Sequence, residues 1–186
     1  SLENSELEKS LNTLIRDAEK NLSTHIENVV LLYDSKDYYS LDISIKKIFD
    51  HGISIKKLHT SLLEEASFIV SQNNFNDQII HININNIIFD DNKELDEISE
   101  DFKVTSLILE IKFIFLSKAL INKISNLFNK NNLKISNLYC SSYVKTFTYR
   151  KNFNKDNFLI FLDIGHERSS SLIFNNSKLK YFKSIP

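Results

Sequence analysis

FLDIGHERSSSLIF, residues 161–174, is the stretch on which the interpretation of the fold depends. An apolar run carries Asp163, followed by Gly165, one of only two glycines in the chain, then a serine-rich tract and a second apolar run. An aspartate at the end of a buried strand can reach a metal-bound phosphate, a glycine permits close backbone approach, and the hydroxyl groups that follow can donate to phosphate oxygens. The pattern therefore predicts either a phosphate-binding turn or an ordinary hairpin, and D-x-G alone does not separate the two.

Length and composition narrow the classes of protein that fit. With 186 residues, 42% of them hydrophobic, the chain is long enough for one or two small domains with a buried core. A net charge of −1 gives no bulk preference for nucleic acid or an anionic membrane. The single cysteine, Cys140, excludes an internal disulfide framework, and we expect a reduced, cytoplasmic setting. Because the chain has no methionine, we expect it to be a fragment or a processed form.

The first 33 residues predict a helix that leads directly into a strand. Ser5 and Glu8 have the spacing of a capping box, and apolar residues recur on one helical face over residues 7–22. The apolar run at residues 26–33 has the length of a buried strand. A helix followed at once by a buried strand is typical of α/β proteins.

The middle of the chain alternates between strand and helix patterns, with a turn around Asp50 and Gly52 and a solvated acidic loop at residues 90–101. Ser54 and Ser117 stand at the N-cap positions of the two helices. The predicted elements are strands at residues 39–45, 80–84, 104–116 and 133–139, and helices at residues 54–70 and 117–128. This order predicts a small α+β sandwich with helices on one face of a sheet.

The last 46 residues predict a short helix or turn, residues 141–150, a strand, residues 158–163, and a final hairpin of residues 170–174 with 178–185. Asparagine tolerates left-handed backbone conformations, so we interpret the three Asn–Asn pairs as turns. These pairs are Asn73-Asn74, Asn131-Asn132 and Asn175-Asn176.

Other polar groups give weaker indications of chemistry. The five histidines, His25, His51, His59, His81 and His166, have no metal-site spacing, and His81 is predicted to lie on the more polar face of a sheet. The acidic loop lacks the ligand spacing of a calcium site. The Cys140-Ser141-Ser142 sequence is not flanked by the glycines of a nucleophile elbow. We therefore expect no catalytic centre and no metal site.

The order of elements resembles the FtsA family of actin-like bacterial cell-division proteins. Residues 5–33 are similar to the helix and strand before the family's inserted subdomain, and residues 54–91, ending in QIIHININNIIFDD, are similar to the helix and strands of that insertion. Residues 133–140 resemble the segment that re-enters the actin-like core. Residues 161–174 resemble the family's second phosphate-binding hairpin, written D-x-G-G-G-T-T-D.

The resemblance implies a fold of the mixed α+β and α/β class: part of an actin-like, ribonuclease H-like subdomain with an inserted SHS2-type α+β subdomain. Residues 1–36 would form the first part of subdomain 1A, residues 37–136 the insertion 1C, and residues 137–186 the second part of 1A with the D-x-G hairpin. The implied function is a cell-division scaffold that links the FtsZ ring to the membrane and recruits later division proteins. This stretch would serve self-association and partner binding, not catalysis.

The family's location is cytoplasmic, at the inner face of the membrane at the division site, and its cofactor is ATP with magnesium. The resemblance assigns contact with FtsZ to another subdomain and membrane contact to a C-terminal amphipathic helix. Along the hairpin the candidate nucleotide-binding residues are Asp163, Gly165 and Ser169. The departures from the family pattern are His166 and Glu167 for two glycines, Arg168 for the first threonine and Ser170 for the last aspartate.

Side chains at the glycine positions hinder approach of the backbone to phosphate, and the family's first phosphate hairpin is missing from this sequence. We therefore expect no measurable ATP binding. An exposed strand over residues 38–46 is the expected partner surface, with Ile43→Pro as its test.

Three other interpretations stay open. The glycine-poor D-I-G hairpin also fits the pilus-assembly protein PilM, an actin-like protein with an inserted subdomain, and the gene neighbourhood would distinguish a pilus cluster from a division cluster. An actin-like ATPase or sugar kinase would need an aspartate base and a further phosphate loop, and neither is identifiable. The last interpretation is an α+β domain unrelated to actin-like folds.

Overall fold

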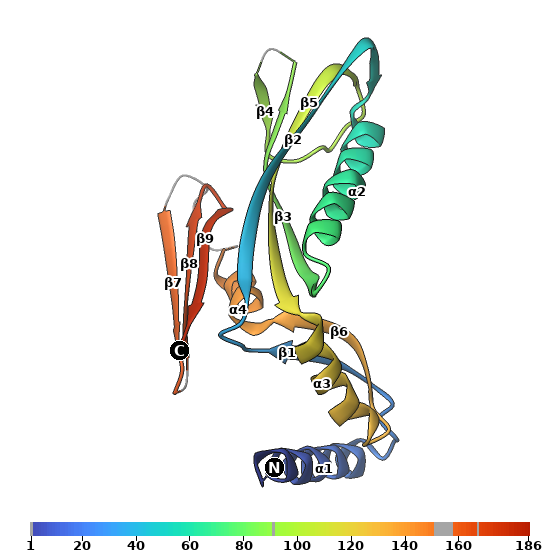
Figure 1. The fold of residues 1–186 in the computed structure, drawn as a ribbon, viewed down its shortest axis with the longest axis vertical. Helices are drawn as coiled ribbons and strands as arrows, with labels where there is room; N and C mark the ends of the chain where they lie inside the picture. The colour runs from blue at the N-terminus through green and yellow to red at the C-terminus, as the bar shows by residue number, and fades with distance from the viewer. Residues whose placement is uncertain (1, 91, 151–157, 167) are drawn as a thin grey trace.

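The computed structural model describes residues 2–90, 92–150, 158–166 and 168–186, with side chains from Glu6 onward and none at Arg150. Within these residues the chain forms four helices and nine strands in three sheets (Figure 1). The helices are α1 (Leu2–Leu22), α2 (Ile55–Asn73), α3 (Lys118–Asn129) and α4 (Ser141–Arg150). The strands are β1 (Asn28–Tyr33), β2 (Tyr39–Ser54), β3 (Asp77–Phe89), β4 (Lys93–Leu95), β5 (Lys103–Ser117), β6 (Lys134–Cys140), β7 (Phe158–Ile164), β8 (Ser169–Asn175) and β9 (Lys178–Ile185).

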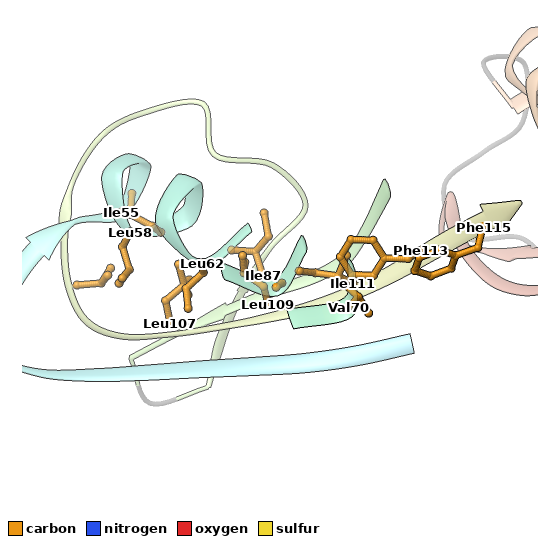
Figure 2. Close-up of a cluster of buried hydrophobic side chains, with 12 residues drawn as sticks. Ile55, Leu58, Leu62, Val70, Ile87, Leu107, Leu109, Ile111, Phe113 and Phe115 are labelled. Atoms are coloured by element: carbon orange, nitrogen blue, oxygen red, sulfur yellow. The ribbon is translucent and has the colours of Figure 1, made fainter. Parts of the chain in front are cut away.

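The largest sheet has the strand order β2-β5-β3-β4, with antiparallel neighbours throughout. Its upper part has α2 packed along one face (Figure 1). The buried residues of α2 recur every three or four positions, whereas those of β5 on the same face recur every two, so each element buries one side in this cluster. Figure 2 shows these side chains meeting between helix and sheet. They include Ile55, Leu58, Leu62, Ala66 and Val70 from α2 and Leu107, Leu109, Ile111, Phe113 and Phe115 from β5.

A second apolar cluster lies on the other face of the same sheet, where β5 is buried on both sides. Ile114 and Leu116 from β5 meet side chains from β8, β9, the end of β6 and the start of α4. These are Leu172, Phe174, Leu179, Phe182, Cys140 and Tyr143, with Tyr38 beside them. The long apolar run at residues 104–116 was predicted as a strand, and its two buried faces explain why it does not alternate like β2.

Strands β1 and β6 form a parallel pair, with Asn28 opposite Lys134 and Tyr33 opposite Cys140. The strands are neighbours although the whole of β2 to α3 lies between them in sequence. The chain therefore leaves one layer, forms the α2-covered sheet, and returns to the layer that it left. This is the order expected for an inserted unit, and the boundaries at residues 36 and 136 stay predictions.

Strands β7, β8 and β9 form an antiparallel sheet of their own. The tight turn between β8 and β9 places Asn176 at φ 51° and Ser177 at φ 63°. Two consecutive positive φ values match the twist of a two-residue hairpin. Asn132, after α3, also has a positive φ of 57°, whereas Asn74 caps α2 at φ −120°, so two of the three predicted asparagine turns use the left-handed conformation.

Three sequence predictions about local structure are wrong. The first helix begins at Leu2, so Ser5 lies inside it and does not cap it; the Ser5 side chain is outside the described part of the structure. Asp50 to Gly52 is not a turn between elements, because β2 continues to Ser54 through a bulge between Ile48 and Ile53. The acidic loop contains β4, which pairs with the end of β3, while Asp91 lies outside the described residues.

None of the helices in the described ranges is both long and apolar enough to cross a membrane.

Candidate functional site

The structure places the three candidate residues of the D-x-G hairpin at or beside the turn that joins β7 to β8. Asp163 is the penultimate residue of β7, Gly165 lies in the turn, and Ser169 begins β8. The N–H of Gly165 donates a 2.9 Å hydrogen bond to the carbonyl of Arg168, which closes the turn. A Cβ at Gly165 would lie 3.1 Å from that carbonyl oxygen. Glycine is therefore favoured here by close approach of the backbone and not by a left-handed conformation.

Asp163 and Ser169 do not come together. In the β7–β8 ladder Asp163 is opposite Ser170, and Ile164 is opposite Ser169. Because successive side chains of a strand point to opposite faces, Ser169 lies on the face opposite to that of Asp163. The hydroxyl on the aspartate's side belongs to Ser170, which is buried and within 3.1 Å of the Ser184 hydroxyl.

Arg168 is the centre of the polar contacts on the Asp163 side. Its Nη2 donates to Asp163 Oδ2 at 3.3 Å and forms an ion pair with the carboxylate of Asp34. Its Nη1 donates to Ser142 Oγ at 3.2 Å and to the hydroxyl of Ser170. The guanidinium therefore contacts four side chains from three parts of the fold, with its own side chain only 14% exposed.

These contacts arise because several strand and helix ends meet at this point. Asp34 directly follows β1, and Ser142 and Lys145 lie in the first half of α4, which follows β6. Ser142 Oγ donates to Asp34 Oδ1 at 3.3 Å, and Lys145 Nζ lies 3.0 Å from Asp163 Oδ2. The carboxyl ends of the parallel β1–β6 pair thus meet the β7–β8 hairpin at one polar cluster, which we call the Arg168 cluster: Asp34, Ser142, Lys145, Asp163, Arg168 and Ser170.

The cluster is electrically balanced, and the pKa values of its members reflect this. Partial burial acts to raise the pKa of Asp163, but hydrogen bonds and charges from Lys145 and Arg168 outweigh it and leave the pKa below its ordinary value. Desolvation acts to lower the pKa of Arg168, but contact with Asp34 and Asp163 raises it overall. Two carboxylates thus face two cations, and the positive charge that a phosphate would need is already compensated.

Other residues that the sequence suggested as candidates for chemistry, Cys140 and His81, are packed within the fold. The Cys140 thiol is buried, and burial raises its pKa to about 11, which argues against a reactive thiolate. His81 lies on the face of its sheet opposite α2. That face was predicted to be the more polar one, but it carries the second apolar cluster, and the His81 ring contacts Tyr139 and Tyr143. His166 is exposed, and Glu167 lies outside the described residues.

The acidic loop also contains structural contacts. Asp90 accepts hydrogen bonds from the backbone N–H groups of Thr105 and Ser106, and Asp101 accepts one from Ser54. Across the ranges that the structure describes, no three histidine, cysteine or acidic side chains are grouped as metal ligands would be.

No protein-family model and no curated protein sequence matches this chain. Among solved structures, one described as the PilM-PilN type IV pilus biogenesis complex matches with a TM-score of 0.57 and 13% sequence identity. The match covers 95% of this chain and 47% of the other, so the chain spans about half the length of that protein. A second solved structure, from Bacteroides thetaiotaomicron, is described as having an actin-like ATPase fold and unknown function. It matches with 12% sequence identity over 94% of this chain and 55% of the other, and its TM-score of 0.37 is too low to support a shared fold.

The PilM match concerns the fold alone, because the identity is low. PilM is the second family that the sequence resembled, and the match supports the actin-like fold expected for both families. The chain therefore has an actin-like, mixed α/β fold. Nothing in the match selects FtsA over PilM.

Sequence reasoning missed most of the Arg168 cluster. Asp34, Ser142 and Lys145 were not proposed as partners of the hairpin, and Arg168 was noted only as the residue at the position of the family's first threonine. One signal was available for Asp34: it directly follows β1, so that Asp34 and Asp163, the penultimate residue of β7, both lie near the carboxyl end of a strand. The pairing itself joins residues on different sheets and has no local pattern in the sequence.

Proposed function

We propose that this chain is the assembly part of an actin-like scaffold, which binds other proteins and does not turn over a nucleotide. The observation that carries the proposal is the position of Arg168. In the alignment of this hairpin with that of the FtsA family, Arg168 stands at the position of a threonine that contacts phosphate. In this chain it pairs with Asp163 and Asp34 instead. A hairpin whose aspartate is bonded to arginine and lysine offers little to a magnesium-bound phosphate.

Within this proposal, residues 37–136 act as an SHS2-type insertion that contacts partners and other copies of the protein. The support is the order strand, helix, strand, strand, with α2 on one face of the sheet. Strand β2 lies at an edge of that sheet, so its outer backbone groups are available for pairing with a strand of another chain.

Two cellular systems fit this role. In an FtsA-type scaffold the protein would lie in the cytoplasm at the inner face of the membrane at the division site, with FtsZ and later division proteins as partners. In a PilM-type scaffold it would take part in pilus assembly with a PilN-like partner, as in the complex that it resembles in fold. Gene neighbourhood distinguishes the two: a division and cell-wall cluster supports the first, and a pilus cluster supports the second.

A calorimetric titration with magnesium and ATP tests the non-enzymatic part of the proposal. We expect no saturable heat, because the hairpin aspartate is already paired. The matched control is Asp163→Ala, since heat that survives this change does not come from the hairpin. Magnesium-dependent micromolar binding that disappears in Asp163→Ala would overturn the proposal.

Self-association through β2 is tested by sedimentation of proline variants. The side chain of Ile43 packs against the α2 cluster, so Ile43→Pro alone also removes core contacts. Consecutive backbone N–H groups in a strand point to opposite edges of that strand. Of the two variants Ile43→Pro and Ser44→Pro, one therefore removes an N–H that faces β5, and the other removes an N–H on the free edge of β2. Ile43→Ala controls for the lost side chain. Association unchanged in both folded proline variants would exclude the β2 edge.

A further inference from the structure

Arg168 connects parts of the chain that belong to different sheets. Asp163 and Ser170 lie in the β7–β9 sheet, whereas Asp34 follows β1 of the β1–β6 pair. Ser142 belongs to α4, directly after β6. One side chain thus bonds to the ends of two separate sheets, over a sequence distance that spans the whole insertion.

The geometry suits a guanidinium better than any other side chain. Nη2 faces both carboxylates, and Nη1 faces the hydroxyls of Ser142 and Ser170. A planar guanidinium holds several acceptors at fixed angles, and charge-assisted bonds of this kind are stronger than neutral ones. With the Arg168 side chain only 14% exposed, the pair with Asp34 is screened less by salt than a surface pair.

We propose that Arg168, Asp34 and Asp163 form a built-in bridge that fixes the orientation of the β7–β9 sheet relative to the β1–β6 pair without a bound ligand. We call these three residues the Arg168 bridge. The proposal goes beyond the proposed function, because it concerns how the two sheets are held and does not depend on which partner the scaffold binds.

The bridge acts beside an apolar contact. Cys140 and Tyr143, at the β6–α4 junction, share a cluster with Leu172 of β8. Apolar contact is non-directional, whereas the bonds of the guanidinium fork are directional. Loss of the bridge should therefore broaden the range of orientations and leave both sheets folded.

Distances between spin labels test this in the whole chain. Leu32 of β1 and Leu162 of β7 are exposed, so labelled cysteines at these positions report the separation of the two sheets. Cys140 is buried and should not react, which labelling of the parent protein checks. In the parent we expect one narrow distance distribution. Its width should at least double in Arg168→Gln and in Asp34→Asn, with no further increase in the double variant.

Lys145→Gln is the matched control, because Lys145 of α4 also contacts Asp163 of β7, but with 53% of its side chain exposed this pair contributes less than the buried pairs of Arg168. It should leave the distribution as narrow as in the parent. Asp34→Asn removes the ion pair between the sheets while leaving the contact of Arg168 with Asp163, so it tests the bridge even where Arg168→Gln does not fold. An unchanged width in Asp34→Asn, or equal broadening in Lys145→Gln, would overturn the proposal.

Discussion

The backbone N–H of Cys140 donates a 2.9 Å hydrogen bond to Nε2 of His81. The bond joins β3, inside the α2-covered sheet, to the end of β6, where the chain has returned to its parallel pair. Only an imidazole whose Nε2 carries no proton can accept this bond. Burial lowers the pKa of His81 to about 4, in agreement with a neutral ring.

This relationship predicts that the protein loses stability in mild acid. The pKa of His81 falls from an ordinary 6.5 to about 4 on folding. The folded state therefore binds fewer protons than the unfolded state between these values, and stability is complete above pH 6.5 and decreases as the pH falls towards 4. A shift of this size corresponds to roughly 3 kcal/mol at most.

Urea unfolding at several pH values measures the effect. His81→Gln should flatten the dependence of the unfolding free energy on pH, although burial also lowers the pKa of His59 and leaves a smaller slope of the same sign. His51→Gln, at an exposed position, should leave the full slope. A parent-like slope in His81→Gln would contradict the assignment.

The two serines predicted as N-caps, Ser54 and Ser117, differ in the hydrogen bonds that their side chains make, and we expect their contributions to stability to differ as well. Ser54 Oγ accepts from the N–H of Lys57 at 3.3 Å and donates to Asp101, which also accepts from the N–H of Lys56. Ser117 makes no side-chain capping bond. Ser54→Ala should lower the free energy of unfolding by about 1 kcal/mol, and Ser117→Ala by clearly less. Equal losses in denaturant titrations would show that the Ser54 contacts have no stabilising effect.

The β8–β9 turn predicts a stabilising substitution. Ser177 has a φ of 63°, a conformation that is costly for residues with a Cβ and easy for glycine. Ser177→Gly converts the turn to Asn-Gly, the preferred sequence for two positive φ values, and should raise the free energy of unfolding by about 0.5–1 kcal/mol. Ser177→Ala separates conformation from loss of the hydroxyl, because alanine keeps the Cβ. A Gly variant no more stable than the Ala variant would refute the argument.

The sequence predicted those parts of the fold that are specified by local pattern. The alternation in β2 and β3, the apolar run of β5, and the turns at Asn132 and Asn176 all depend on neighbouring residues. The extension of β2 through Gly52 depends on pairing with β5, which no local pattern contains. The same holds for the candidate site: Asp163 and Gly165 were found by motif, whereas Asp34, which binds the same guanidinium as Asp163, is brought there by the tertiary structure.

A buried lysine gives the last prediction. Lys112 lies on the central strand β5 with 3% of its side chain exposed, and its Nζ lies 2.6 Å from Oδ2 of Asp42 on the neighbouring strand β2. Removing one partner of such a pair leaves a buried charge uncompensated, whereas replacing the charge by an apolar group of similar size is often neutral or stabilising.

Because Asp42 is 64% exposed, water reduces the cost of losing it, and we expect Asp42→Ala to lower the free energy of unfolding by about 1–2 kcal/mol. Lys112→Met should change it by less than about 1 kcal/mol in either direction, and the double variant Asp42→Ala with Lys112→Met should recover most of the loss. Chemical denaturation of the parent, the two single variants and the double variant measures the interaction energy between Asp42 and Lys112. A loss in Lys112→Met larger than that in Asp42→Ala would mean that the ammonium stabilises the sheet through contacts other than its pair with Asp42.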